Sequence, residues 1–189
     1  MKIALFGGTF DPVHWGHLLL AESARSVFHL DRVLFIPTGI PPHKVPAAAA
    51  PLHRLRMLRL ATASNPAFDV SDWEIRQKRV VYSFETIAHF HHANQRLFFI
   101  LGTDMLKMIP LWRQGTSLLN RCTFLAAERP EAPWPRLPAG MRRKARRIPW
   151  PAVSLASHEI RARIRQGQSI RYQVPDTVGK YIRKHGLYR

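Results

Sequence analysis

The chain opens with an apolar run that breaks into a glycine pair and then continues as a helix-like segment. This junction constrains the fold more than any other feature. Ile3 to Phe6 is a short run of the kind that parallel sheets bury on both faces. Gly7 and Gly8 allow the backbone to turn sharply and to approach a ligand closely. Leu18 to Phe28 then has the spacing of a helix. The pattern therefore predicts a strand, a tight turn and a helix, which is how an α/β fold begins.

Strand-like and helix-like segments continue to alternate along the chain. Further strands are expected at Val33 to Ile36, Leu97 to Leu101 and Thr123 to Ala127. Further helices are expected at 52–61, 84–90, 157–166 and 176–185. This order predicts an α/β fold with a doubly wound open parallel sheet and a C-terminal helical extension. Ligands of such sheets gather at the C-terminal ends of the strands.

With 189 residues, the chain suits a single domain spanning 1–189, in which 155–189 forms a helical C-terminal subregion. The proline-rich span from Ala132 to Pro138 and the basic run from Arg142 to Arg147 are expected to form a surface connection, because they are too short to separate two cores.

The composition is strongly basic, with a formal net charge of +17. Such a charge attracts phosphates, nucleic acids and other polyanions. Two interpretations stay open: a generally solvated basic surface, or a nucleic-acid site with the run from Arg142 to Arg147 as its footprint. The charge alone names no partner, and no specific nucleic acid is expected.

Cys122 is the only cysteine, so no intrachain disulfide can form. It lies in an apolar run, where a buried thiol is more common than a nucleophile. The chain has no signal-peptide pattern and no run of about 20 apolar residues, the length needed to span a bilayer. We therefore expect a cytoplasmic protein without a membrane partner.

His14 and His17 lie three residues apart across Gly16, where the first helix begins. Both imidazoles can face an anion as donors, and the free amides and positive dipole end of the helix favour the same occupant. A metal site is the competing interpretation, but two histidines without a further cluster of Cys or carboxylates do not complete a tetrahedral set. The order of glycines, Thr9, Asp11-Pro12 and the histidines predicts a nucleotide site.

This loop resembles the HxGH signature of the nucleotidylyltransferase superfamily, and the whole chain is similar to the bacterial nicotinate-nucleotide adenylyltransferases. The further matching segments are Ile36-Pro37 with 41–44, Asp72 to Ile75, Tyr82-Ser83 with Glu85-Thr86, the stretch from Phe99 through Trp112 to Pro130, and that from Ile160 to Tyr188. The resemblance implies a Rossmann-like nucleotidylyltransferase fold. It also implies transfer of an adenylyl group from ATP to nicotinate mononucleotide in NAD biosynthesis.

The resemblance also implies roles for particular residues. The implied catalytic residues are His14, His17, Lys44 and Arg161. The implied ATP-binding residues are Gly7, Gly8, Thr9, Phe10, His14, His17, Asp104, Ser157, His158 and Arg161. The implied nicotinate mononucleotide-binding residues are Thr9, His43, Lys44, Tyr82, Ser83, Asp104 and Trp112. Mg²⁺ is expected with the triphosphate, held by phosphates and water rather than by a protein cage.

The chain departs from the family pattern at two places. The C-terminal phosphate motif has Ala156 and His158 where the family has serine and threonine, and Ser83 replaces a threonine. Ser157 and Arg161 remain, so an anion site is still expected there through helix amides and a guanidinium. His158 could donate to a phosphate or face solvent.

Other interpretations stay open at this point. By spacing alone, Trp112 could be a core aromatic and Asp104 a helix N-cap. A sister transferase that uses phosphopantetheine would share the HxGH loop. A serine hydrolase is disfavoured, because the sequence has no Gly-x-Ser-x-Gly elbow. Adenylyl transfer needs no covalent intermediate, so we expect catalysis by alignment and by stabilisation of charge on the phosphoryl oxygens.

Overall fold

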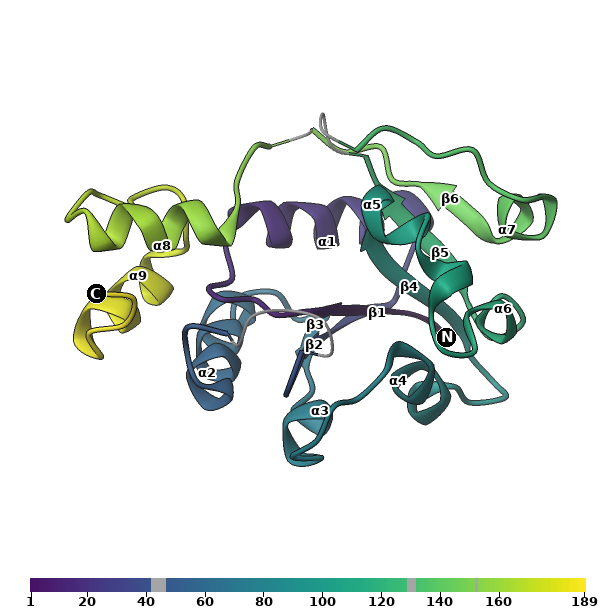
Figure 1. The fold of residues 1–189 in the computed structure, drawn as a ribbon, viewed down its shortest axis with the longest axis horizontal. Helices are drawn as coiled ribbons and strands as arrows, with labels where there is room; N and C mark the ends of the chain where they lie inside the picture. Colours follow the sequence, from purple (N-terminus) through teal and green to yellow (C-terminus); the bar gives the residue numbers. More distant parts are fainter. Residues whose placement is uncertain (42–46, 129–131, 152) are drawn as a thin grey trace. The chain divides into compact units, whose positions relative to one another are not determined.

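The structure is a computed structural model that describes residues 1–41, 47–128, 132–151 and 153–189. In chain order, its elements are β1 Lys2–Gly8, α1 Trp15–Phe28, β2 Arg32–Pro37, α2 Pro51–Thr62, β3 Phe68–Val70, α3 Trp73–Arg76, α4 Ser83–Phe90, β4 Arg96–Gly102, α5 Thr103–Leu106, the 3-10 helix η1 Ile109–Leu111, α6 Gly115–Leu118, β5 Thr123–Ala127, α7 Ala139–Lys144, β6 Ala145–Arg147, α8 Ser157–Arg165 and α9 Asp176–Lys184 (Figure 1). The strands and longer helices expected from the sequence are therefore present.

The strands form one parallel sheet in the order β3-β2-β1-β4-β5-β6. In the register of the central pairs, Lys2 lies opposite Arg96 and Phe98 lies opposite Thr123. The chain starts in the middle of the sheet and builds outward in both directions, which confirms the doubly wound open fold. Gly8 and Gly102 both end strands, so the loops after β1 and β4 leave the same edge of the sheet.

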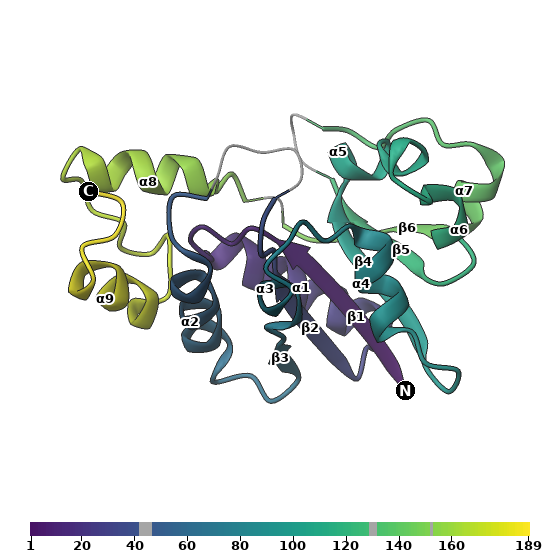
Figure 2. The same ribbon diagram turned by 60° about the horizontal axis from the view of Figure 1, so that its bottom comes forward.

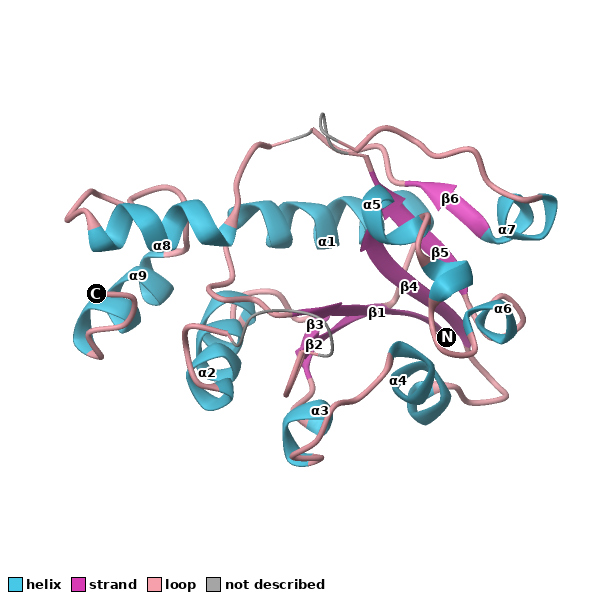
Figure 3. Cartoon of the chain, viewed as in Figure 1, coloured by secondary structure: helices cyan, strands magenta, loops and turns pink. Residues whose placement is uncertain are grey.

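The chain divides into two compact units, each assembled from separate segments. The first unit contains Met1–Gly7, Leu20–Leu34 and Tyr82–Ala152. Its centre is made by β1, β4 and β5, whose middle residues are almost all buried. Figure 3 shows β4, β5 and β6 as neighbouring arrows within this unit. The continuous apolar runs form these strands because both faces of the sheet are covered.

The second unit contains Gly8–Leu19, Phe35–Val81 and Val153–Arg189. In this unit α9 packs against α2, and both views of the ribbon show the two helices side by side (Figures 1 and 2). Val178 and Ile182 are the buried apolar positions of α9, and the hydroxyl of Tyr181 lies 3.0 Å from His53 Nδ1 on α2. The helices α8 and α9 thus belong to the unit that carries residues Gly8–Leu19, which include His14 and His17.

The prediction of a plain surface connection over the basic run was wrong. Residues 139–147 form α7 and then the edge strand β6, which pairs with β5. Met141, Ala145 and Ile148 are buried at regular intervals between exposed arginines, and this apolar spacing supports the two elements. The density of arginine and lysine concealed that pattern. Arg146 and Arg147 remain exposed on the edge strand, where charged side chains discourage pairing with other strands.

Candidate functional site

The loop after β1 is shaped by glycine at the positions where a side chain would not fit. A Cβ on Gly8 would come within 3.0 Å of the Phe10 ring. Phe10 itself is 2% exposed and has a positive φ of 50°, so the loop folds back over its own aromatic ring. At Gly7, by contrast, a Cβ would make only an ordinary 3.6 Å contact with Phe99. Of the two glycines, Gly8 is therefore the one that the turn requires.

The two histidines of the loop lie together. Their rings stack with centroids 3.7 Å apart, and the rings of Phe10 and His17 make a T-shaped contact with centroids 5.0 Å apart. The backbone N–H of His14 donates to Nδ1 of His17 at 3.3 Å. Because Nδ1 accepts a hydrogen bond, the neutral ring of His17 carries its proton on Nε2. The loop thereby holds His17 as an Nε2–H donor, which is the form that can bind a phosphate oxygen.

Gly16 lets the rings take this arrangement. A Cβ at this position would lie 3.1 Å from His14 Nδ1 and 3.2 Å from its Cε1. His14 is 4% exposed and is stacked on His17, so it has little room to yield. The glycine between the two histidines is therefore a packing requirement of the imidazole pair.

The start of α8 is tied to this same loop. Ser157 Oγ donates to the carbonyl of Pro12 at 2.9 Å, and Arg161 Nη1 donates to the carbonyl of Asp11 at 2.8 Å. In the first turn of α8 the amides of Glu159 and Ile160 donate to the carbonyl of Ala156, and those of Ser157 and His158 have no acceptor within the helix and are the ones that an anion can use. His158, in the first turn, is exposed. The structure thus brings Ser157 and Arg161 to the loop that contains Asp11 and Pro12, and their binding of a phosphate stays a prediction.

A buried arginine on α2, which the sequence analysis did not identify, binds the backbone of the loop after β1. Arg54 on α2 has no exposed surface, and its pKa is lowered by burial, against the attraction of Asp11 and other acidic groups nearby. Its guanidinium donates to four backbone carbonyls, those of Thr9, Thr38, Gly39 and Ala49. One side chain therefore joins the loop after β1, through Thr9, to Thr38 and Gly39 and to Ala49. A charged residue at an apolar helical position was the signal that could have revealed it.

Asp11 is a second residue whose role the sequence analysis did not identify, although Asp11 lies within the loop that contains His14 and His17. It is 4% exposed, and its carboxylate accepts from the amides of Ala48 at 2.7 Å and Ala49 at 3.1 Å. The hydroxyl of Tyr188, the residue before the last, donates to Oδ1 at 2.7 Å. Burial is the main cause that raises the pKa of Tyr188, and the hydrogen bond to Asp11 is the next. The hydroxyl of Tyr188 therefore stays neutral and can donate. The segment after α9 is thus held, through Tyr188, to the loop that contains Asp11.

The first unit holds Tyr82, Ser83, Asp104 and Trp112 of the expected site residues. Tyr82 precedes α4, and Ser83 and Phe84 begin it. The rings of Tyr82 and Phe84 are nearly parallel, with centroids 6.3 Å apart, and the guanidinium carbon of Arg113 lies 5.5 Å from the first centroid and 5.7 Å from the second. Such distances are those of cation–π contacts. Arg113 is exposed, so it places a positive charge beside the start of α4.

Trp112 and Asp104 are not in the positions that their alternative interpretations require. Trp112 is only half-buried and meets Phe99 edge to face at 6.5 Å, so it is not a fully enclosed core residue. Gly102, not Asp104, is the N-cap of α5, and Asp104 is exposed in the first turn. A side chain on Gly102 would meet Asp104 Oδ1. Both Trp112 and Asp104 therefore keep polar or aromatic surface open to a ligand.

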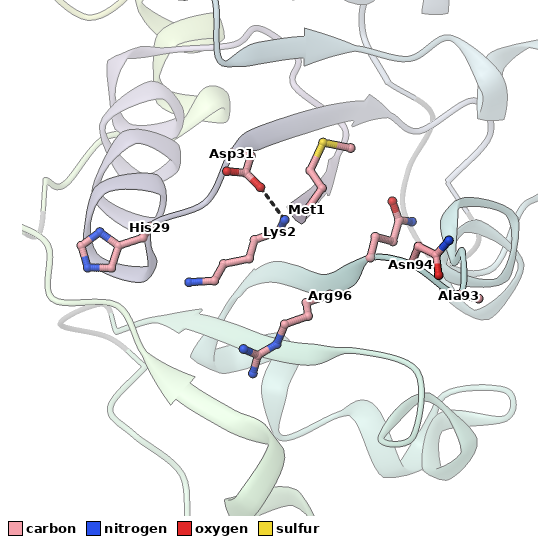
Figure 4. A pocket seen from close by; sticks show the side chains of 8 residues that line it. Met1, Lys2, His29, Asp31, Ala93, Asn94 and Arg96 are labelled. Carbon is pink, nitrogen blue, oxygen red and sulfur yellow. Dashed lines mark hydrogen bonds between the residues drawn. The ribbon is translucent and has the colours of Figure 1, made fainter.

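His43 and Lys44 lie outside the described residues. In the first unit, a shallow hollow of about 630 Å³ lies at the start of β1 and β4 (Figure 4). Lys2, His29 and Arg96 line it, and the figure shows the hydrogen bond from the Lys2 amide to Asp31. This hollow is at the beginning of the strands, whereas the loops with Gly8 and Gly102 follow their ends, so it is separate from the candidate site.

Among the described residues, no group of three or more His, Cys, Asp or Glu side chains could hold a metal ion. Within the same part of the chain, every helix is too short or too polar to cross a membrane.

Comparison of the sequence with known proteins shows the family to which the chain belongs. The family model described as cytidylyltransferase-like matches residues 5–166. A relative from Moorella thermoacetica, named probable nicotinate-nucleotide adenylyltransferase, is 41% identical over 100% of this chain and 92% of its own length. One from Thermus thermophilus with the same name is 42% identical, with all of both chains covered. This chain belongs to the nicotinate-nucleotide adenylyltransferase family.

Solved structures support the fold. The nicotinic acid mononucleotide adenylyltransferase of Plasmodium falciparum complexed with NaAD has a TM-score of 0.82 at 19% identity, covering 99% of this chain and 97% of that one. The same enzyme complexed with APC has a TM-score of 0.77 at 18% identity, covering 99% and 96%. The Rossmann-like nucleotidylyltransferase fold expected from the sequence is therefore confirmed.

Proposed function

We propose that this chain transfers the adenylyl group of ATP to nicotinate mononucleotide, forming deamido-NAD and pyrophosphate in NAD biosynthesis. The observation that carries the proposal is the HxGH loop, in which His17 is held as an Nε2–H donor against His14. Family membership supports the choice of reaction, because the relatives that cover the whole chain bear the name of this enzyme. The full chain, 1–189, would act as one nucleotidylyltransferase domain.

The reaction requires positioning more than covalent chemistry. A 5′-phosphate oxygen of the mononucleotide would attack the α-phosphorus of ATP in line, and the bond from that phosphorus to the bridging oxygen of pyrophosphate would break. His14 and His17 would donate to the ATP phosphates, where charge grows on the bridging and leaving oxygens. Arg161 and the first amides of α8 would hold the leaving pyrophosphate. Each role uses a group that the second unit places at one loop.

We assign the remaining parts of the substrates to the residues implied by the family pattern. The ring of Trp112 would stack on the nicotinate, the backbone near Tyr82 and Ser83 would bind its carboxylate, and Asp104 would accept from a ribose hydroxyl. Arg113 would add a positive charge near that carboxylate. His43 and Lys44 would approach the phosphates, and Gly7, Gly8, Thr9 and Phe10 would line them, with His158 at the edge.

Mg²⁺ would come bound to ATP, neutralising the triphosphate with water as its other ligand. His14, His17 and Arg161 would act as hydrogen-bond donors to the phosphates. They therefore suit a metal-bound triphosphate, because they would not compete for the ion. The buried thiol of Cys122 suits the reducing cytoplasm, where we place the protein.

The test is an acceptor comparison. The purified protein is mixed with ATP and Mg²⁺ and with nicotinate mononucleotide, nicotinamide mononucleotide or phosphopantetheine in turn, and pyrophosphate release is measured. We expect the nicotinate compound to give the highest kcat/KM by a clear margin. No release with it, or faster release with phosphopantetheine, would refute the proposed function.

A further inference from the structure

The carboxylate of Asp11 has three hydrogen-bond donors and two guanidinium groups, those of Arg161 and Arg54, as neighbours, and they do not approach it equally. Tyr188 and Ala49 donate to Oδ1, and Ala48 donates to Oδ2 at 2.7 Å. Arg161 Nη1 is 3.8 Å from Oδ2, beyond hydrogen-bond distance. Hydrogen-bonded pairs of a guanidinium and a carboxylate normally close to about 2.7–2.9 Å. The pair is thus held apart although the carboxylate is almost fully buried.

The same arginine is already oriented by a neutral group. Arg161 Nη1 donates to the backbone carbonyl of Asp11 at 2.8 Å, so its position does not depend on the carboxylate. A guanidinium has five N–H donors, and the open ion pair leaves the others of Arg161 available. About a quarter of the Arg161 side chain is exposed, which is enough for a phosphate to reach it.

From this geometry we propose that Tyr188 is a positioning residue of the phosphate site: its hydroxyl holds the Asp11 carboxylate in place and keeps it from closing onto Arg161. Without that hydroxyl, Oδ1 would lose a donor in a buried environment, and a buried acceptor without its partner turns toward any donor within reach. Of the two guanidinium groups, Arg54 already donates to four backbone carbonyls, whereas Arg161 Nη1 lies 3.8 Å from Oδ2. Asp11 would then compete with the triphosphate for the guanidinium.

The inference rests on the proposed function to the extent that Arg161 holds pyrophosphate. It adds a role for the segment after α9, because Tyr188 controls how freely Arg161 on α8 can bind an anion. Asp11 and Tyr188 lie in the same unit as Arg161, and all the contacts that carry the argument are within it.

The primary experiment compares Tyr188→Phe with Tyr181→Phe. Each removes one hydroxyl from the C-terminal segment, and Tyr181 bonds His53 on α2 instead of Asp11. For Tyr188→Phe we expect KM for ATP, and the Kd for ATP measured by calorimetry, to rise about 10-fold, as for outer partners of other ligand-binding groups. KM for nicotinate mononucleotide should not change. For Tyr181→Phe both KM values should match the wild type.

The second arm approaches the bond from its other end. Asp11→Asn keeps an oxygen acceptor for Tyr188 and Ala49 and removes the charge that attracts Arg161, but it turns an amide NH₂ toward the backbone N–H of Ala48, so its own KM for ATP is only the reference value. Adding Tyr188→Phe to Asp11→Asn should cause no further rise in KM for ATP, because the two residues act through one contact and their effects are not additive.

Three results would overturn the proposal. Tyr188→Phe could equal Tyr181→Phe, it could raise KM for both substrates together, or its effect could persist in the Asp11→Asn background. Circular dichroism shows whether each variant is folded at the assay temperature, and if Asp11→Asn does not fold, the comparison of the two tyrosines decides. The calorimetric Kd for ATP needs no acceptor, so it separates failure of this inference from failure of the proposed reaction.

Discussion

Gly16→Ala should lower activity by more than any change in stability accounts for. Gly16 is the second residue of α1, where the higher helix propensity of alanine, worth at most about 0.5–1 kcal/mol, is opposed by the crowding of His14. The new methyl would lie 3.1 Å from His14 Nδ1, so the imidazole must move by a few tenths of an ångström. His14 cannot move toward His17, because the two rings already stack with centroids 3.7 Å apart.

The size of the loss follows from that displacement. A misplacement of about 1 Å can lower a rate about 100-fold, so a few tenths of an ångström corresponds to roughly 4- to 10-fold in kcat. Gly140→Ala is the matched control: Gly140 is the second residue of α7, and nothing lies within 4 Å of its Cβ position. Pyrophosphate release gives kcat, and thermal unfolding gives Tm. Full activity in Gly16→Ala, or a loss of activity no larger than its loss of folded protein, would refute the reasoning.

Three further predictions concern the first unit. Arg113→Gln should reduce the preference for nicotinate over nicotinamide mononucleotide by about 5-fold, equivalent to the ~1 kcal/mol of an exposed charge pair, with Arg121→Gln as the control; an unchanged ratio of kcat/KM values would contradict it. Burial raises the pKa of Cys122 to about 12 from an ordinary 9.0, so the unfolded thiol ionises first and stability should fall as pH rises above 9, by about 1.4 kcal/mol per unit. Cys122→Ala should show a smaller drop in Tm between pH 8 and pH 10, and equal drops would be the contrary result. The same thiol should stay unreactive toward a thiol reagent at pH 8 until the protein unfolds, and rapid labelling of the native chain would show that it is accessible.

The sequence predicted the sheet well because its strands are long apolar runs bounded by turn residues. β1, β4 and β5 were expected within two residues of their observed bounds. β3 is only three residues long and carries an aspartate, so no periodicity marks it. β6 follows a helix directly and consists mainly of arginine, a composition typical of surface segments. Short edge strands depend on their neighbours for stability, which a local pattern does not show.

The residues of the candidate site that belong to a short sequence motif could be predicted. Those that act through contacts between residues far apart in the sequence could not. His14, His17, Ser157 and Arg161 come together at one loop. The support of that loop by Arg54, and by Tyr188 across 177 positions, could not be inferred from spacing. Arg54 acts through backbone carbonyls, which every sequence supplies, and Tyr188 acts through the carboxylate of a residue far away in the sequence, so no local pattern marks either contact.

The most direct test of the central claim is the kinetics of His17→Ala with ATP and nicotinate mononucleotide. The claim is that the Nε2–H of His17, fixed by the amide of His14, acts on charge that develops in the transition state. Loss of such a donor typically lowers kcat about 100-fold or more. We predict that fall with KM for ATP nearly unchanged, whereas an unchanged kcat with a raised KM would show that the imidazole only binds ATP and would contradict the account.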